Sequence, residues 1–330
     1  MSAKRATKST KWIPGTSPQV RASEIVGDSV KLRLESVRRL LKRVRCHWQR
    51  ESEHVHQLRV ATRRAQMAIQ VFAKFLPTKP VRKTLRRLKK FRRAANAARD
   101  LDVLLHRYQK QPVSNRLTAA QRNELVHFLG KKRGEAQVDL DALTDRRGRK
   151  TFQRNVRQLL QRKPSTDTDG VSLRELADQE LRPLLQEFFQ LARLGSSDIE
   201  ALHRLRIAGK RIRYVMELMA GAYSSDVFET IYRSFCELQK QFGEVNDHAT
   251  AVDTLGKSWT NCDQKLRRLL DRQVKAEQQL LDRRCQQLQQ TWTASVWQTL
   301  EQQFERLLTS DAVGSGETET PGTGPIQSPT

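Results

Sequence analysis

The sequence predicts an all-α protein made of two similar halves. Three observations lead to this prediction: apolar residues recur with the helical period over most of the chain, Gly and Pro are sparse at 15 and 10 of 330 residues, and one amphipathic helix occurs twice. Long helices with few turns satisfy all three, whereas many short strands would require more turn-forming residues.

The repeated helix begins near residue 51. On a helical projection of residues 51–76, the apolar side chains form one stripe: Leu58, Ala61, Ala65, Ile69 and Phe72. The opposite side carries polar and cationic side chains: His56, Arg59, Arg63, Gln66, Gln70 and Lys74. We therefore expect a helix that buries one side and presents a cationic side outward.

The same pattern returns after a shift of 147 residues. The shift matches His56 with His203, Leu58 with Leu205, Arg59 with Arg206, Ala61 with Ala208, Arg63 with Lys210, and Arg64 with Arg211. It extends further, because Arg99-Asp100 begins 43 residues after His56 and Asn246-Asp247 begins 43 residues after His203. Duplication of one ancestral unit is the simplest explanation.

The composition divides the chain into four segments. Residues 1–22 mix Lys, Arg, Ser, Thr and Pro without periodicity, which predicts a disordered basic arm. The first helical half is expected over residues 23–165 and the second over residues 166–309. Residues 310–330 have the composition of a flexible tail. The turn-forming segment 164–170 falls where the repeat places the join between the halves.

Periodicity places five helices in each half. Those of the first half are expected at residues 24–50, 53–76, 79–110, 116–146 and 149–162. Those of the second half are expected at residues 171–195, 198–221, 225–256, 261–290 and 294–309. Short connections favour antiparallel neighbours, so we expect two pseudo-symmetric antiparallel four-helix bundles, each with a short extra helix.

The charge is strongly positive and unevenly distributed. The net charge of +25 predicts attraction to polyanions. Residues 24–165 contain 37 Lys and Arg against 12 Asp and Glu, whereas residues 166–309 contain 19 against 21. The nearly neutral second half nevertheless concentrates positive charge on its repeated helix, at Arg204, Arg206, Lys210, Arg211 and Arg213.

A second basic stripe is expected on the helix at 79–110. Arg82, Arg86, Lys89 and Arg93 share one of its faces, and a helix of about 25 residues is roughly 37 Å long. Two such stripes could line a groove that follows several phosphates. The alternative interpretation is an ordinary solvated face, but such a face would normally also contain acidic residues at i,i+4 spacing.

The two His-led basic helices, each followed by an (Arg/Asn)-Asp pair, resemble the CHAD family over roughly residues 20–309. The resemblance implies two pseudo-symmetric four-helix bundles whose basic helices face a shared central surface that binds inorganic polyphosphate. Carried onto this chain, it implies contacts from His56, Arg59, Arg63, Arg64, His203, Arg206, Lys210, Arg211 and Arg213. We add the stripe of Arg82, Arg86, Lys89 and Arg93 to this expected site.

The chain departs from the repeat at Gln66, because the second half has Arg213 at the matching position. We expect weaker contact with phosphate at Gln66, offset by the richer third helix. The pairs Arg99-Asp100 and Asn246-Asp247 are interpreted as structural, with each Asp pairing with an Arg of a neighbouring helix.

The histidines at the starts of the repeated helices admit two interpretations. As neighbours of Arg, His56 and His203 are expected to be neutral without ligand and to gain a proton beside phosphate. The alternative is a His that hydrogen-bonds a backbone carbonyl at a helix start.

The sequence contains no clear motif for a metal site or a catalytic site. His54 and His56 point about 200° apart on a helix, and neither has a Cys or carboxylate at i+3 or i+4. Gly256-Lys257-Ser258 ends like a phosphate-binding loop, but Ala251 stands where such a loop needs its first Gly. We therefore expect no metal, no cofactor and no catalytic residue.

The remaining alternative is a nonspecific nucleic-acid-binding protein. Recognition of bases and single strands uses aromatic side chains, yet aromatic residues are only 6% of the chain, and Phe72, Phe75 and Phe91 fall on or near apolar faces. Association with nucleic acid is expected at low salt.

The sequence also suggests the cellular compartment. Four cysteines stand singly, which is typical of reduced thiols, and no apolar run approaches the roughly 18 residues of a membrane span. The N-terminus lacks the apolar region of a signal peptide. We expect a cytoplasmic protein without a membrane partner, with polyphosphate granules as a place of association. The oligomeric state and the preferred polyphosphate length are left open.

We expect no release of phosphate from polyphosphate or nucleoside triphosphates with Mg²⁺ or Mn²⁺, because no carboxylate cluster suited to a catalytic metal accompanies the basic stripes. A phosphate-release assay tests this. Turnover that survives purification and is lost on substitution of an acidic residue would contradict it.

Overall fold

The computed structural model of the protein describes residues 11–47, 52–110, 117–161, 170–194, 199–257, 259 and 262–309. These ranges contain ten α-helices and two short 3-10 helices. The described ranges have no strand, and their only β-type pairing is an isolated bridge between Arg21 and Ser172. The predicted all-α fold is confirmed.

All ten predicted helices are present. The first half contains α1 (Ala22–His47), α2 (Glu53–Val71), η1 (Ala73–Phe75), α3 (Thr78–Lys110), α4 (Ala119–Thr144) and α5 (Arg146–Leu160). The second half contains α6 (Leu173–Arg193), α7 (Ile199–Leu218), η3 (Ala220–Ala222), α8 (Ser225–Leu255), α9 (Gln264–Thr291) and α10 (Ala294–Thr309). The 3-10 turns that follow α2 and α7 are related by the same shift of 147 residues as the repeated helices.

Side-chain caps determine where several helices begin. Thr118 starts α4 with a capping box to Gln121, and Ser172 starts α6 with a capping box to Glu175. The Asp145 carboxylate caps α5 by accepting a hydrogen bond from the Gly148 amide. Each cap satisfies amide groups that the first helical turn leaves without partners.

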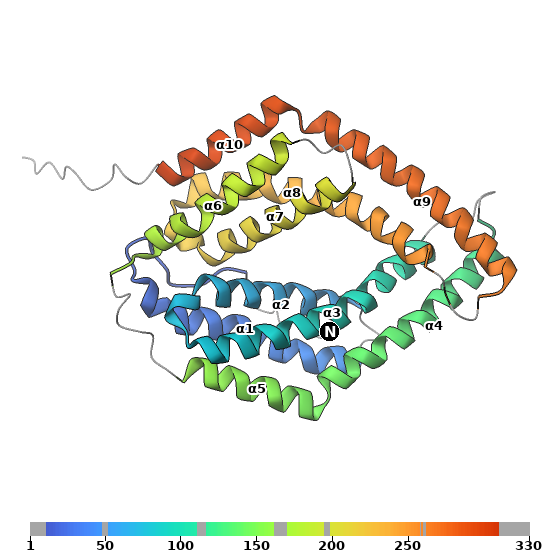
Figure 1. Ribbon diagram of the computed structural model, residues 1–330, viewed down its shortest axis with the longest axis horizontal. Coiled ribbons are helices and arrows are strands. Elements are labelled where there is room, and N and C mark those ends of the chain that lie inside the picture. The colour runs from blue at the N-terminus through green and yellow to red at the C-terminus, as the bar shows by residue number, and fades with distance from the viewer. Residues whose placement is uncertain are drawn as a thin grey trace, which may run out of the picture.

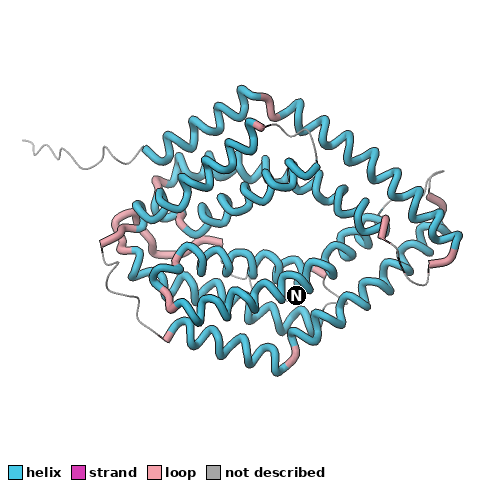
Figure 2. The backbone as a smooth tube through the Cα atoms, viewed as in Figure 1, coloured by secondary structure: helices cyan, strands magenta, loops and turns pink. Residues whose placement is uncertain are grey.

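Four helices of each half enclose an apolar core. In the first half α1, α2, α3 and α5 pack together, and in the second half α6, α7, α8 and α10 do so. The tube and ribbon views show the two halves as the lower and upper parts of an elongated ring (Figures 1 and 2). The halves contact each other along α2 and α7.

A second apolar core closes one end of the ring. With 33 and 31 residues, α3 and α8 are much longer than α2 and α7, so their ends extend beyond the bundles. There they pack with α4 and α9 through Leu101, Leu104, Tyr108, Leu117, Leu125, Phe128, Leu129, Ala251, Leu255, Leu266, Leu269 and Leu270. This core therefore joins the two halves.

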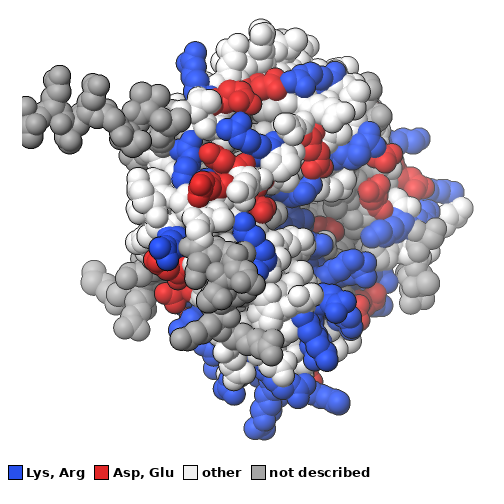
Figure 3. Space-filling view, turned by 60° about the vertical axis from the view of Figure 1, so that its left-hand side comes forward, with Lys and Arg blue, Asp and Glu red and all other residues white. Residues whose placement is uncertain are grey.

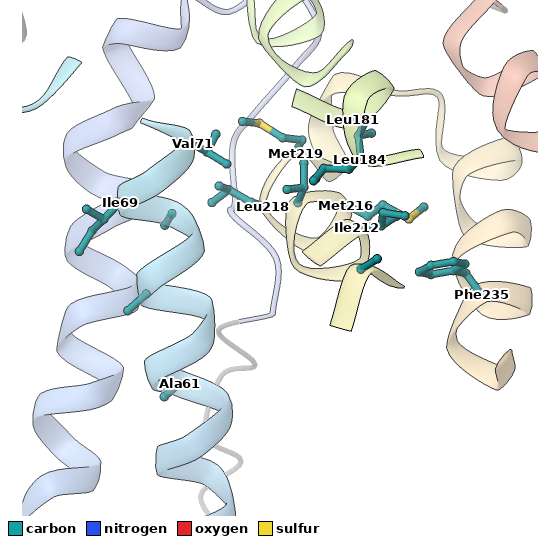
Figure 4. Close-up of a cluster of buried hydrophobic side chains, with 14 of the residues drawn as sticks. Ala61, Ile69, Val71, Leu181, Leu184, Ile212, Met216, Leu218, Met219 and Phe235 are labelled. Atoms are coloured by element: carbon teal, nitrogen blue, oxygen red, sulfur yellow. The ribbon is translucent and has the colours of Figure 1, made fainter. Parts of the chain in front are cut away.

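Apolar side chains hold the two cationic helices together at one end. Val71 of α2 points toward Leu218 and Met219 at the end of α7, and all three are buried (Figure 4). Burying apolar surface contributes roughly 25 cal/mol per Å². This contact therefore opposes the repulsion between two helices of like charge.

A buried carboxylate lies beside this contact. Glu217 of α7 is 1% exposed and accepts hydrogen bonds from Arg64 Nε of α2 at 2.6 Å and from the Tyr232 hydroxyl of α8 at 2.9 Å. The Arg33 guanidinium of α1 donates to the Glu217 backbone carbonyl at 3.3 Å. Burial, and secondarily repulsion by Arg64, lower the pKa of Arg33 to about 10. Glu217 thus links helices of both halves.

Part of the expected basic arm is packed rather than disordered. Trp12 makes edge contacts with Tyr232 and Phe228 at ring-centroid distances of 5.0 and 6.0 Å, and Lys11 accepts a hydrogen bond from Arg33 through its backbone carbonyl. The composition of the segment is mostly polar and charged, so it predicted disorder. It did not reveal that Trp12 packs into a cluster of aromatic rings, which is enough to hold a short segment in place. Residues 1–10 and 310–330 lie outside the described residues.

Glu217→Gln should reduce the free energy of unfolding by about 3 kcal/mol, because it leaves Arg64 and Arg33 without a buried counter-charge. Tyr232→Phe should cost only about 1 kcal/mol, since it removes one hydrogen bond. Denaturant unfolding measures both. Equal stabilities of Glu217→Gln and the wild type would contradict this role of Glu217.

Candidate functional site

Two adjoining cavities lie between the basic helices of the two halves. The first has a volume of about 270 Å³ and reaches the middle of α3 and α8, and the second has a volume of about 490 Å³ and reaches the start of α7. Four side chains line both cavities: Arg63, Arg206, Lys210 and Tyr214. The cavities therefore form one site built from both halves.

Eight of the thirteen predicted site residues line these cavities: His56, Arg59, Arg63, His203, Arg206, Lys210, Arg211 and Arg213. They come from the cationic sides of α2 and α7, whose apolar sides are buried in the two bundles. The helical projection thus identified the inner surface of the molecule. What the projection could not show is that the two cationic sides face each other.

Residues that the sequence repeat relates to each other line the cavities from both halves. A shift of 147 residues relates Arg92 to Gln239, Val103 to Thr250 and Met67 to Tyr214, and each of these residues lines a cavity.

Sequence reasoning missed Arg92, Asn96, Tyr214 and Gln239.

At Gln66, where the repeat lacks an Arg, a neighbouring helix supplies a guanidinium group. Arg92 Nη1 of α3 donates a hydrogen bond to Gln66 Oε1 at 2.9 Å, and both side chains line the second cavity. The first half therefore supplies a guanidinium beside Gln66 from α3, whereas the second half supplies Arg213 from α7 itself. Arg92, which is not part of the predicted stripe, therefore stands beside the position at which the first repeated helix lacks an Arg.

Two carboxylates stand among the cations of the first cavity. Arg59 Nη1 lies 3.6 Å from Asp100 Oδ1, which agrees with the interpretation of Asp100 as the partner of an Arg on a neighbouring helix. Asp247 lines the same cavity at the matching position. Burial, and secondarily the charge of Arg63, lower the pKa of Arg206 to about 10, while Asp247 opposes this shift.

Lys210 has the most perturbed cationic group of the site. Burial lowers the pKa of its amine to about 6, helped by the positive charges of Arg206, Arg63, Arg213 and Arg59. Near neutral pH this lysine is therefore mostly uncharged in the free protein. An anion in the cavity would favour its protonated form.

His56 is also held in its neutral form. Burial and the charge of Arg99 lower the pKa of its imidazole, and Glu53 only partly opposes them. This agrees with the expectation that His56 is uncharged without ligand. His203 is exposed at the edge of the second cavity.

Several buried polar atoms of the cavity walls lack a protein partner. Among the described residues, Arg206 Nε, Asn96 Oδ1 and both amide atoms of Gln239 find no hydrogen-bond partner. Unpartnered buried polar groups cost free energy, so they are rare unless a ligand or water binds them.

Five predicted residues lie elsewhere. The Arg64 side chain is 20% exposed and pairs with Glu217, so it has a structural role. Arg82, Arg86, Lys89 and Arg93 are exposed on α3 and line neither cavity. The face of α3 that reaches the site instead presents Arg92, Asn96, Arg99 and Asp100. The stripe was placed wrongly because periodicity identifies a solvated face but not which neighbour it faces.

A model of the CHAD domain family matches residues 32–256, which contain both repeated helices and both (Arg/Asn)-Asp pairs. The chain belongs to the CHAD domain family. A comparison with curated proteins gives no match for this CHAD protein.

Solved structures share the fold of this CHAD domain. The crystal structure of the CHAD domain from the plant Ricinus communis superposes with a TM-score of 0.64 at 23% identity, covering 88% of this chain and 94% of that chain. PptA from Streptomyces chartreusis superposes with a TM-score of 0.58 at 15% identity, covering 84% of this chain and 99% of that chain.

In the part of the chain that the structure describes, no group of three or more His, Cys, Asp or Glu side chains is placed to hold a metal ion. No helix in the described ranges combines the length and hydrophobicity that crossing a membrane requires.

At about pH 7.5, binding of a phosphate-rich anion should take up close to one proton through Lys210, because a nearby phosphate favours the charged amine. The affinity should fall as the pH rises above about 6, and the uptake that depends on Lys210 should vanish well below that pH, where its amine is charged in both states. Calorimetry in buffers of different ionisation enthalpy measures the uptake. Lys210→Arg is the control, because its side chain stays charged; equal uptake by this variant would contradict the assignment.

Proposed function

We propose that this CHAD domain binds inorganic polyphosphate in the central cavities without catalysing a reaction. The supporting observation is the charge of the walls. Eight Lys and Arg side chains line the cavities against two Asp: Arg59, Arg63, Arg92, Arg99, Arg206, Lys210, Arg211 and Arg213. Polyphosphate binding is the known role of the family.

The types of side chain favour phosphate over other anions. Seven of the eight cations are guanidinium groups, which bind phosphate oxygens in a bidentate manner, and Lys210 adds an ammonium when an anion is present. The cations come from three helices, α2, α3 and α7, so phosphates inside the cavities can be contacted from several sides. A polymer of many phosphates would offset the repulsion among all these cations together.

The cavities are poorly suited to recognise nucleotide bases. Tyr214 is the only aromatic residue that lines them within the described chain, and it is 5% exposed. Stacking on bases requires an accessible aromatic face. A uniform polymer of phosphates needs no such face.

Arg63→Glu and Lys210→Glu should each weaken polyphosphate binding by comparable amounts, at least about tenfold, because each places a carboxylate beside the bound phosphates. Lys4→Glu, outside the described residues, should mainly slow association. All three change the formal net charge equally. Binding should also weaken steeply with salt, because bound phosphates release counterions.

Titrations across a salt series measure these affinities, and stopped-flow kinetics gives the association rates. The two-sided site is wrong if Lys210→Glu behaves like Lys4→Glu while Arg63→Glu abolishes binding. An affinity independent of salt would exclude the electrostatic mechanism.

A further inference from the structure

A second basic surface lies on the outside of the first half. Five cations of α5 are exposed on one side of that helix: Arg146, Arg147, Lys150, Arg154 and Arg157. The opposite side of α5 buries Phe152 and Leu159 against the bundle. Because α5 packs against both α1 and α3, it forms the crest of a ridge between them (Figure 1).

The flanks of this outer ridge are equally basic. On α1, five exposed Lys and Arg stand between residues 38 and 45. On α3, six exposed Lys and Arg stand between residues 82 and 93, and they include the stripe of Arg82, Arg86, Lys89 and Arg93. We define the outer ridge as these exposed cations of α1, α3 and α5.

Acidic side chains do not neutralise the ridge. Residues 36–50, 78–99 and 146–163 contain no Asp or Glu. Within the described chain, none of the exposed cations of the ridge has a carboxylate oxygen within 4 Å. Exposed cations at this density repel one another, so they lower the stability of the free protein.

The fold itself does not require these charges. The matching surface of the second half consists of α6, α8 and α10, and it mixes both signs, as in the surface pairs Arg233–Glu229 and Lys240–Glu237. Figure 3 shows the same difference, with Lys and Arg prevailing in the lower part of the molecule and mixed signs in the upper part. Two halves with one fold therefore differ in their outer charge, which indicates a function of the ridge.

We propose that the outer ridge binds double-stranded DNA through its phosphates, at a site separate from the central cavities. The major groove of B-form DNA is about 12 Å wide and admits an α-helix such as α5. The cations of α1 and α3 on either side of the crest could then contact the phosphates of the two strands. Such binding is independent of base sequence, because Lys and Arg contacts with phosphates dominate it.

The composition of the ridge disfavours other polyanionic partners. Large apolar side chains that are exposed in the described chain lie on other helices, so the ridge has no apolar anchor for a bilayer. Among the described residues of α1, α3 and α5, the aromatic side chains Phe91, Tyr108 and Phe152 are buried, so they offer no surface on which single-stranded nucleic acid could stack.

The test measures binding of a labelled DNA duplex of about 20 base pairs, longer than the roughly 50 Å of α3. The ridge variant is Lys150→Glu with Arg154→Glu. The matched control is Arg233→Glu with Lys240→Glu, which reverses two exposed cations of α8 and changes the net charge equally. Lys210→Glu tests the central site. Polyphosphate binding by all three variants is measured in parallel.

The ridge variant should bind the duplex at least about tenfold more weakly, with a salt slope reduced by about two. The control and Lys210→Glu should stay within about threefold of the wild type for DNA, and the ridge variant should do so for polyphosphate. Equal losses of DNA binding by the ridge variant and the control would overturn the proposal in favour of long-range attraction.

Three further results would also overturn it. A loss of DNA binding in Lys210→Glu as large as in the ridge variant would place DNA in the central cavities. Tighter binding of a single strand than of the duplex would exclude recognition of both strands. Ridge-dependent binding to vesicles of anionic phospholipid, without duplex binding, would assign the ridge to a membrane. If Lys210→Glu instead keeps the affinity of the wild type for polyphosphate, the proposed polyphosphate site in the cavities is wrong, but the proposal for the ridge still stands.

Discussion

Electrostatic repulsion between α2 and α7 is the constraint on which the structure depends. The two helices bring Arg59, Arg63, Arg206 and Lys210 around shared cavities, and without ligand these cations repel one another. The fold opposes this repulsion with buried apolar contacts at the ends of both helices and with Glu217, which pairs with Arg64 across the interface. It also keeps Lys210 mostly neutral near pH 7, which removes one charge from the free protein.

The second core and the N-terminal segment also join the two halves. The ends of α3, α4, α8 and α9 bury a common apolar cluster beyond the bundles. On the side of the second bundle, Trp12 packs against α8, and Val20 accepts a backbone hydrogen bond from Leu173 at 2.8 Å. These contacts lie outside the cavities, so groups that do not line the cavities help to fix the cationic walls in place.

Internal duplication explains both the symmetry and the asymmetry of the molecule. Most positions that line the cavities correspond between the halves, since both halves form walls of the same cavities. The outer surfaces have diverged, because only one of them is a ridge without acidic residues. Within the site the same divergence appears at Gln66, where the guanidinium comes from Arg92 of α3 instead of α2.

The sequence by itself determined the helices, the duplication and the cationic side of each repeated helix, because these properties follow from local periodicity and residue spacing. It also identified Asp100 as a partner for an Arg. Only the tertiary structure decided which cationic faces meet. It turned Arg64 toward Glu217, placed Arg92 in the cavity and left Arg93 outside, although these two are adjacent in the sequence. Neighbouring residues on a helix point about 100° apart, so the packing of α3 against α2 and α5 determines which of them faces a ligand.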